Sequence, residues 1–238
     1  MRYFILLILL SIKSFAQEVH CTLPFYPTGA IVHHSYFDLQ YSEQHEQALW
    51  VAYKLTPGHL IKNVKRSNKF KTDPKVKTGS ASLADYKASG YDRGHLAPAG
   101  SMTFNKTAMD ESFYMSNMSP QLPGFNRGIW KKLETKVREW TKVSDSLYVV
   151  SGPVLKNITK TIGANKVAVP KAYYKVLLQF KNGKVKTCAY LLPNEKSNKD
   201  LKHFICSINK IETIIGIDFN KNLDDNVEYE LEHHYVEF

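Results

Sequence analysis

Residues 91–99 (YDRGHLAPA) hold the side chains of this chain that are best suited to chemistry, an arginine and a histidine two positions apart. If the segment is a strand, Arg93 and His95 share a face, because side chains alternate along a strand. Imidazole, with an unperturbed pKa near ~6.5, suits a general base, and a guanidinium matches phosphate oxygens through paired hydrogen bonds. Hydrolysis of a phosphodiester needs both groups, one to deprotonate water and one to stabilise the charge that develops on phosphorus.

A structural alternative accounts for the same two residues: Arg93 pairs with a carboxylate and His95 ends a strand. The pair alone favours this alternative, because short motifs often arise by chance. The context favours chemistry. After His95 the pattern predicts a helical turn over 105–111, an apolar strand over 113–117 and a helix that begins at Asn126. The two strands and the helix form a small ββα unit, with a histidine on its first strand and an asparagine at the entrance of its helix.

Further motifs follow one another in a fixed order between residues 33 and 219. They are WVAY (50–53), FKTDP (70–74), DRGH (92–95), SNMSPQ (116–121), NRGIW (126–130), SGP (151–153) and VPKAYYKV (169–176). On these motifs the chain resembles the DNA/RNA non-specific endonucleases, the family that includes Serratia nuclease and mitochondrial endonuclease G. The resemblance implies an α+β fold of the ββα-metal type, in which helices flank a central antiparallel sheet or sheets.

The resemblance also implies roles for the two residues of the ββα unit. His95 is the expected general base, and Asn126 is the expected single protein ligand of a catalytic Mg²⁺, which Mn²⁺ could replace. A lone amide ligand suits Mg²⁺, because this ion keeps several waters and touches few protein oxygens. From its position alone, Asn126 also suits an ordinary helix N-cap. Both roles can hold together, since a helix N-terminus favours a phosphate.

Glu134 and Arg138 lie further along the same expected helix, four residues apart. The resemblance implies that Glu134 orients metal-bound water and that Arg138 lies near the phosphate. The alternative is a solvated Glu–Arg pair, worth about 0.3–0.5 kcal/mol.

Four further residues complete the expected site through the resemblance. Arg93 contacts the scissile or a neighbouring phosphate, and Arg66 binds phosphate. Asp92 supports the strand and loop by hydrogen bonds, and Asn117 orders either the waters of the metal or the loop. Asn117, Arg66 and Asp92 are therefore the expected substrate-binding set. The structural alternative for Asn117 is a turn residue before Ser119.

The N-terminus has the pattern of a secretory signal peptide, with Arg2, an apolar run over 4–10, and Ser14 and Ala16 before Gln17. We therefore expect a signal peptide over 1–16, an N-terminal extension over 17–30 and one endonuclease domain over 31–238. The mature protein would be secreted or periplasmic and would not be held in a membrane.

Composition and charge bound the function. The chain has 238 residues, of which 43% are hydrophobic, which excludes collagen-like and disordered classes. The net charge is +10, and about +8 remains after a signal peptide with two basic residues is removed. Nucleic acid, anionic lipid and acidic polysaccharide all fit such a charge. Three cysteines are too few for a disulfide scaffold, and a bridge between Cys188 and Cys206 stays open.

Hydrophobic periodicity predicts the elements around the site. Strands are expected over 35–41, 48–53, 167–169, 173–180 and 185–192, with a hairpin turn at Asn182-Gly183, and they suggest two β-rich layers. Helices are expected after Asn126, over 200–208 and on through 211–215, and in the tail from 220, and a long surface loop is expected over 56–90.

The expected function is that of a secreted, Mg²⁺-dependent, sugar-non-specific endonuclease that leaves 5′-phosphate ends on DNA and RNA. Two alternatives stay open: a basic protein that binds nucleic acid without cutting it, and a toxin paired with an inhibitor protein. The sequence also leaves open a homodimer, the preference for DNA or RNA, the preference for single or double strands, and the biological role.

Overall fold

The computed structural model describes residues 23–24, 26–219, 221, 224–233 and 238. The expected signal peptide lies outside these residues, and so does part of the expected N-terminal extension. A seven-stranded sheet forms the centre of the described part, and its six pairings are all antiparallel. In spatial order its strands are β1 (Ala30–His33), β2 (Asp38–Ser42), β3 (Gln47–Leu55), β6 (Ser146–Pro153), β9 (Ala172–Lys181), β10 (Lys184–Pro193) and β11 (Ile205–Cys206).

Two small ribbons and five α-helices surround this sheet. The ribbons are β4 (Asp92–His95) with β5 (Met118–Gln121) and β7 (Thr161–Ile162) with β8 (Val167–Ala168). The helices are α1 (Leu83–Tyr86), α2 (Lys106–Glu111), α3 (Lys131–Thr141), α4 (Ile208–Ile215) and α5 (Asp225–His233). Short turns are η1 (Pro57–Leu60), η2 (Ala99–Ser101), η3 (Met115–Asn117), η4 (Phe125–Trp130) and η5 (Leu201–Phe204). None of the described helices is long and apolar enough to cross a membrane.

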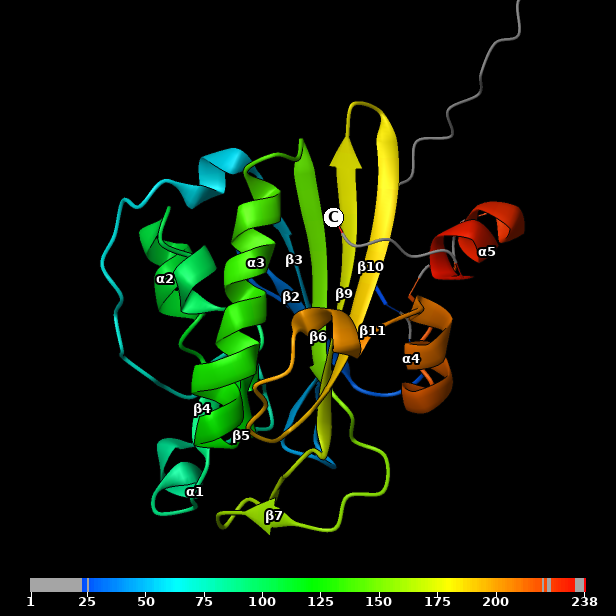
Figure 1. The fold of residues 1–238 in the computed structure, drawn as a ribbon. Helices are drawn as coiled ribbons and strands as arrows, with labels where there is room; N and C mark the ends of the chain where they lie inside the picture. The colour runs from blue at the N-terminus through cyan, green and yellow to red at the C-terminus, as the bar shows by residue number, and fades with distance from the viewer. Residues whose placement is uncertain (1–22, 25, 220, 222–223, 234–237) are drawn as a thin grey trace, which may run out of the picture.

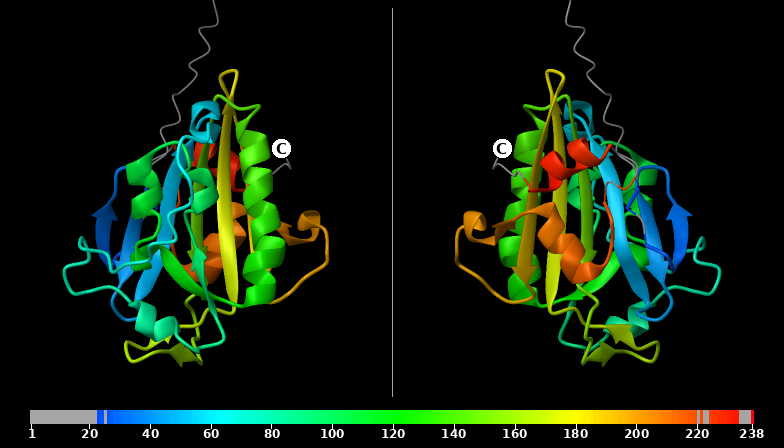
Figure 2. Two further views of the ribbon diagram at one scale, coloured as in Figure 1. Left: turned by 90° about the vertical axis from the view of Figure 1, so that its left-hand side faces the viewer. Right: turned by 90° about the vertical axis from the view of Figure 1, so that its right-hand side faces the viewer.

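Both faces of the sheet are buried, by α3 on one side and by α4 and α5 on the other (Figures 1 and 2). In β9, Tyr173 and Leu177 belong to the core under α3, and Tyr174, Val176 and Leu178 belong to the core under α4. The expectation of two β-rich layers is therefore wrong. The strands predicted over 48–53, 173–180 and 185–192 are confirmed as β3, β9 and β10, and the continuous apolar run of β9 reflects a strand covered on both faces.

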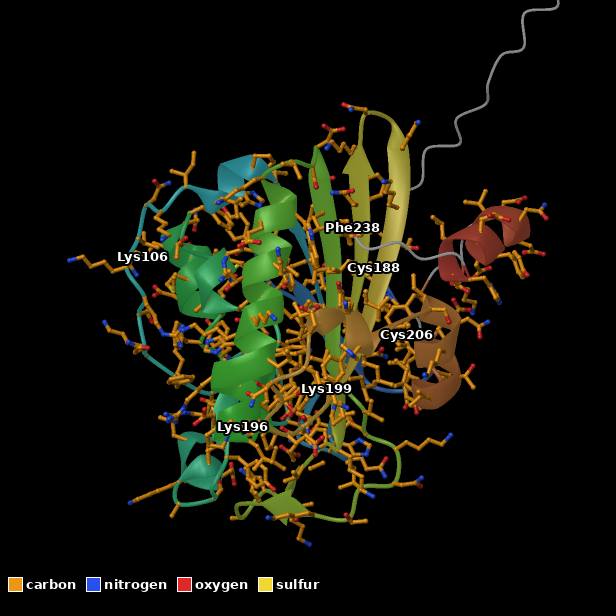
Figure 3. The ribbon with its side chains drawn as sticks, in the orientation of Figure 1. Lys106, Cys188, Lys196, Lys199, Cys206 and Phe238 are labelled. Atoms are coloured by element: carbon orange, nitrogen blue, oxygen red, sulfur yellow. The ribbon has the colours of Figure 1, made fainter. Side chains whose placement is uncertain are left out.

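The hairpin between β9 and β10 is confirmed. Asn182 and Gly183 have φ values of 51° and 70°, as the tight turn requires, and Asn and Gly adopt this left-handed region more readily than other residues. Cys188 of β10 belongs to the core under α3, whereas Cys206 of β11 belongs to the opposite core (Figure 3). Ala189, not Cys188, pairs with Cys206, so the two cysteines lie in opposite cores and no disulfide bridge joins them.

The ββα unit is present with two shifts. The expected strand over 113–117 is wrong: a 3₁₀ turn covers Met115–Asn117, and β5 begins at Met118, where it pairs with His95. The run was apolar because Phe113 and Met115 are fully buried, and periodicity cannot separate a short buried turn from a strand. Helix α3 begins at Lys131, not at Asn126.

The later helices also differ in part from expectation. Residues 200–208 form η5 and β11 instead of a helix, because Asp200 caps only a short turn by accepting a hydrogen bond from the Lys202 amide. Helix α4 starts after Ser207, which caps it, and ends at Gly216 with φ of 72°. Helix α5 confirms the expected helix in the tail.

Candidate active site

The site is built on the β4–β5 ribbon where it meets the start of α3. Gly94 allows the two strands to approach, because a Cβ atom there would lie 2.2 Å from the side chain of Gln121. The register sets Arg93 opposite Pro120 and His95 opposite Met118. A glycine between the two functional residues is therefore a requirement of packing.

His95 is almost buried, with 8% of its surface exposed. Its Nε2 atom has no hydrogen-bond partner among the described residues. The indole Nε1 of Trp130 donates to the backbone oxygen of His95 at 3.3 Å, which ties β4 to the start of α3. The backbone of His95 therefore has a fixed place, and its Nε2 is a buried ring nitrogen whose hydrogen-bonding capacity no described residue takes up.

Two aromatic rings, Phe70 and Phe113, form a floor under the charged groups, which we call the aromatic floor. The His95 ring lies 5.8 Å from Phe70 and 4.9 Å from Phe113 between centroids. The Arg93 guanidinium carbon lies 4.3 Å above Phe70, and that of Arg66 lies 4.9 Å from the centre of Phe113. Contact of both Arg93 and His95 with Phe70 confirms that the two residues share a face.

The pKa of His95 is lowered to about 3, mainly by burial and then by the charges of Arg66 and Arg93. The imidazole is therefore neutral at neutral pH, which is the form that accepts a proton. A phosphate held by Arg66 and Arg93 would offset their positive charge and raise the proton affinity of His95.

Asn126 lies in η4, one turn before α3, and its backbone is not an N-cap. The interpretation as an N-cap is wrong because Gly128, with φ of −103° and ψ of −110°, interrupts the helical backbone between Asn126 and α3. Asn126 Nδ2 donates to Asp92 Oδ2 at 2.9 Å. Arg127 binds the same carboxylate with two hydrogen bonds of 2.8 and 2.7 Å. Since a carboxylate only accepts, Asn126 must turn its Nδ2 to Asp92 and leaves its Oδ1 for another partner.

Glu134 is half-buried on α3, and burial raises the pKa of its carboxyl. The positive charges of Lys175, Arg138 and Arg66 oppose that rise. Glu134 therefore interacts electrostatically with the cations of the site. Arg138 donates from Nη2 to Thr135 Oγ1 at 2.9 Å. Gly100 gives Arg138 room, because a Cβ atom there would lie 3.2 Å from its Nη1.

Asn117 lies below the site and is fully buried. Its Oδ1 accepts from the Ala97 amide at 2.8 Å, and its Nδ2 donates to the backbone oxygens of Ala97 and Ser112 at 2.9 and 2.8 Å. Both amide hydrogens are therefore used. Of the two roles expected for Asn117, these contacts favour ordering of the loop after His95 over ordering of the waters of the metal.

A hollow of about 630 Å³ opens beside the site, and we call it the basic hollow. Its lining residues are Lys62, Asn63, Val64, Lys65, Arg66, Gly100, Thr103 and Arg138. A second hollow of about 430 Å³ is lined by residues that include Lys87, Tyr91 and Arg93. Arg66 lines the first hollow and Arg93 lines the second. The positive charges of both arginines lower the pKa of His95.

Several residues of the site escaped sequence reasoning. Phe70 was visible only as part of a motif, and Phe113 only as part of an apolar run. Arg127 and Trp130 were visible only as part of the NRGIW motif, and nothing in the sequence indicated their partners Asp92 and His95, which are distant in sequence. Lys175 did have a visible signal in the sequence, because a lysine inside the apolar run of a strand is unusual.

Comparison with known proteins agrees with this geometry. The profile of the DNA/RNA non-specific endonuclease family matches residues 21–226. Mitochondrial endonuclease G of Bos taurus is 36% identical over 200 residues, which cover 78% of this chain and 67% of that protein. Nuclease C1 of Cunninghamella echinulata var. echinulata is 36% identical over 203 residues, which cover 78% and 81%. A crystal structure of the EndoG/EndoGI complex matches with a TM-score of 0.78 and 34% identity, over 84% of this chain and 89% of that one.

Proposed function

The chain belongs to the DNA/RNA non-specific endonuclease family, and from this premise we propose how its site cuts nucleic acid. The enzyme is Mg²⁺-dependent and sugar-non-specific, and it hydrolyses internal phosphodiester bonds to 5′-phosphate and 3′-hydroxyl ends. The observation that carries this proposal is the neutral His95, which shares the aromatic floor with the guanidinium groups of Arg66 and Arg93.

The donor set around Asn126 fits Mg²⁺. Within the described residues, His, Cys, Asp and Glu form no cluster of three or more that could cage a metal ion. A single amide oxygen fits an ion that keeps most of its water shell. Asp92 takes the amide nitrogen of Asn126, and so it points the oxygen away from itself. When bound, Mg²⁺ supplies Lewis-acid stabilisation of the phosphate and of the leaving 3′-oxygen.

The residues of the chain then divide the work of hydrolysis. Arg66 and Arg93 bind the phosphate oxygens. The neutral His95 imidazole accepts a proton from water as the water oxygen bonds to phosphorus, and the bond from phosphorus to the 3′-oxygen breaks. The leaving 3′-oxygen takes a proton from solvent water and becomes the 3′-hydroxyl. Glu134 accepts hydrogen bonds from water in the site and so orients it, and Arg138 stabilises the negative charge of the phosphate.

The substrate follows the two hollows that contain Arg66 and Arg93. Both hollows present lysine or arginine side chains, which contact phosphates and carry no sequence information. Recognition through the backbone explains how one site accepts both DNA and RNA. The same basic surface supports the alternative of a protein that binds nucleic acid without cutting it, but a binding protein has no need for the free His95 nitrogen.

Secretion and partners are part of the proposal. The signal-peptide pattern at residues 1–16 directs the chain out of the cytoplasm, although the endonuclease G relatives are mitochondrial proteins. Mass spectrometry of the mature protein, with Gln17 as its first residue, tests this step. EndoG is held by EndoGI in a solved complex, and we infer that a comparable inhibitor protein could pair with this chain in a toxin system. Co-purification from the producing cells tests that pairing, and light scattering tests the homodimer.

The activity itself is tested with the purified mature chain on supercoiled plasmid and on RNA, in Mg²⁺, in Mn²⁺ and in chelator. We expect both substrates to be cut only with a divalent ion, and Asn126→Ala to need far more Mg²⁺ than the wild type. Asn209→Ala, on α4 at the other face of the sheet, is the matched control. A plasmid that shifts in a gel but stays intact would favour the binding protein instead.

A further inference from the structure

Lys175 is a fully buried lysine in the middle of the sheet, with 0% of its surface exposed. Its neighbours Tyr173 and Leu177 on β9 belong to the core under α3, so Lys175 points to the same side. Its Nζ donates to Ser151 Oγ on β6, the residue directly opposite in the register. The same Nζ lies 4.4 Å from the centre of the Trp130 ring, at the start of α3.

A buried ammonium group must have a counter-charge, because its removal from water costs several kcal/mol. Burial lowers the pKa of Lys175 to about 8, and the Glu134 carboxylate acts in the opposite direction. Ser151 and the Trp130 ring are uncharged, so they satisfy the ammonium without neutralising it. Glu134 is the one acidic side chain that acts on Lys175 among the described residues.

The same interaction matters to Glu134. This residue follows Trp130 by one helical turn, so both side chains lie on the face of α3 that meets Lys175. Among the positive groups that act on Glu134, Lys175 has the largest effect, ahead of Arg138, Arg66 and Lys131. The charge of Glu134 also adds to burial in raising the pKa of the Tyr53 hydroxyl on β3.

Lys175 differs from the other cations in what it can bind. Arg66 and Arg138 line the basic hollow, where phosphates of the substrate would engage them, and Lys131 is exposed to solvent. Lys175 has no path to substrate or water, so its charge stays directed at Glu134 throughout the reaction.

We propose that Lys175 is a positioning residue for Glu134: held in the sheet by Ser151 and Trp130, it supplies the fixed charge that keeps the carboxylate ionised in its place. This inference rests on the proposed role of Glu134 in orienting water. The alternative is a lysine that only fills the core, and two measurements separate the roles.

The first measurement is chemical unfolding in chelator, without substrate, of Lys175→Met, Glu134→Gln and the double variant. We expect Lys175→Met to lower the unfolding midpoint and the double variant to recover most of that loss, because it leaves no unpaired charge. Additive losses would overturn the pairing. If Lys175→Met alone fails to fold, folding of the double variant still supports it, and failure of both to fold overturns it.

The second measurement is the pH dependence of cleavage. We expect Lys175→Met to lower kcat at least tenfold with little change in KM, and to move the acid limb to higher pH by about one unit. In the Glu134→Gln background, Lys175→Met should lower kcat no further. Tyr174→Phe is the matched control, since it removes a buried hydrogen bond to the Leu49 oxygen from the other face of β9. It should change stability alone.

The outcomes are distinguishable. A Lys175→Met enzyme with wild-type kcat and acid limb overturns the inference, even if Glu134→Gln is inactive and the proposed function stands. A Glu134→Gln enzyme with full activity overturns the proposed role of Glu134, and the inference with it.

Discussion

Asp92 is the residue whose role changes most once its contacts are known. It was expected to support the strand and loop, and it does so by binding Arg127 through both oxygens. It also takes the amide nitrogen of Asn126, and so it orients the expected metal ligand. Under the proposed mechanism, the motif DRGH therefore supplies a ligand-orienting carboxylate, a phosphate-binding arginine, a glycine needed for packing and a base in four consecutive positions.

We predict that Asp92→Asn raises the Mg²⁺ concentration needed for half-maximal cleavage by about 10- to 100-fold, the usual cost of losing a group that orients a metal ligand. The reason is that an amide can accept or donate, so it no longer fixes the orientation of Asn126. A Mg²⁺ titration of the initial cleavage rate measures the effect. Arg127→Ala is the matched control: it keeps the bond between Asp92 and Asn126 and should have a smaller effect. Equal effects of both variants would contradict this account.

His95 gives a prediction about stability and pH. Its pKa is lowered to about 3 in the folded protein, against ~6.5 in an unfolded chain, so the unfolded state binds a proton first as the pH falls. Above about pH 6.5 His95 is neutral in both states and does not change the free energy of unfolding with pH. Below that pH the unfolded state gains a proton at His95, so the free energy of unfolding falls progressively. His95→Gln, which does not titrate, should lose less stability than the wild type between pH 6.5 and 5, by up to about 2 kcal/mol. Urea unfolding at both pH values measures this, and parallel losses in the two proteins would refute it.

At the scale of elements, the ribbon β4–β5 and the helix α3 position the site. The sequence predicted β4 and the apolar face of α3, because alternation and helical spacing are local signals. It could not predict that η4 precedes α3, because the interruption depends on the backbone of Gly128. The loop over 56–90 was expected at the surface, but Asp73 within it is buried and bound by His34 Nε2 and Ser116 Oγ. Contacts between such distant residues have no local signature.

The ribbon gives a second prediction about stability. Gly94→Ala should destabilise the protein by about 1–3 kcal/mol, the usual cost of overpacking, because its Cβ would meet Gln121 at 2.2 Å. Gly58→Ala in η1 is the matched control, since a Cβ there would meet only Thr56 Oγ1, at an ordinary contact distance of 3.7 Å. Chemical unfolding compares the two. Adding Gln121→Ala to Gly94→Ala should restore part of the loss, and a Gly94→Ala protein as stable as the control would contradict the packing argument.

At the scale of the whole molecule, one antiparallel sheet carries the active face on one side and α4 and α5 on the other (Figure 2). The resemblance predicted the fold class, and the strand patterns placed most of the sheet. The order β3-β6-β9 could not be predicted, because β3 and β6 are separated by ninety residues that contain the site itself. For the same reason Lys175, a residue of β9, was not foreseen beneath Glu134.

The net charge of +10 makes cleavage depend on salt. Each phosphate contact contributes a slope of roughly −0.9 to a plot of log affinity against log salt on duplex DNA. We predict that kcat/KM falls steeply with salt and that Lys62→Gln with Lys65→Gln, in the basic hollow, reduces the slope by about 1 to 2. Lys184→Gln with Lys186→Gln, on the exposed β9–β10 hairpin, is the matched control and should leave it unchanged. A cleavage rate indifferent to salt would exclude recognition through the backbone.

The account depends most on His95 as the general base, and one measurement tests this directly: single-turnover cleavage by His95→Ala with and without added imidazole. We predict that His95→Ala lowers the rate by roughly 10²- to 10⁴-fold, the usual contribution of a general base, and that free imidazole restores part of it in its neutral form. A His95→Ala enzyme that cuts at the wild-type rate would contradict the account, and His95 would then be a structural residue of the ribbon.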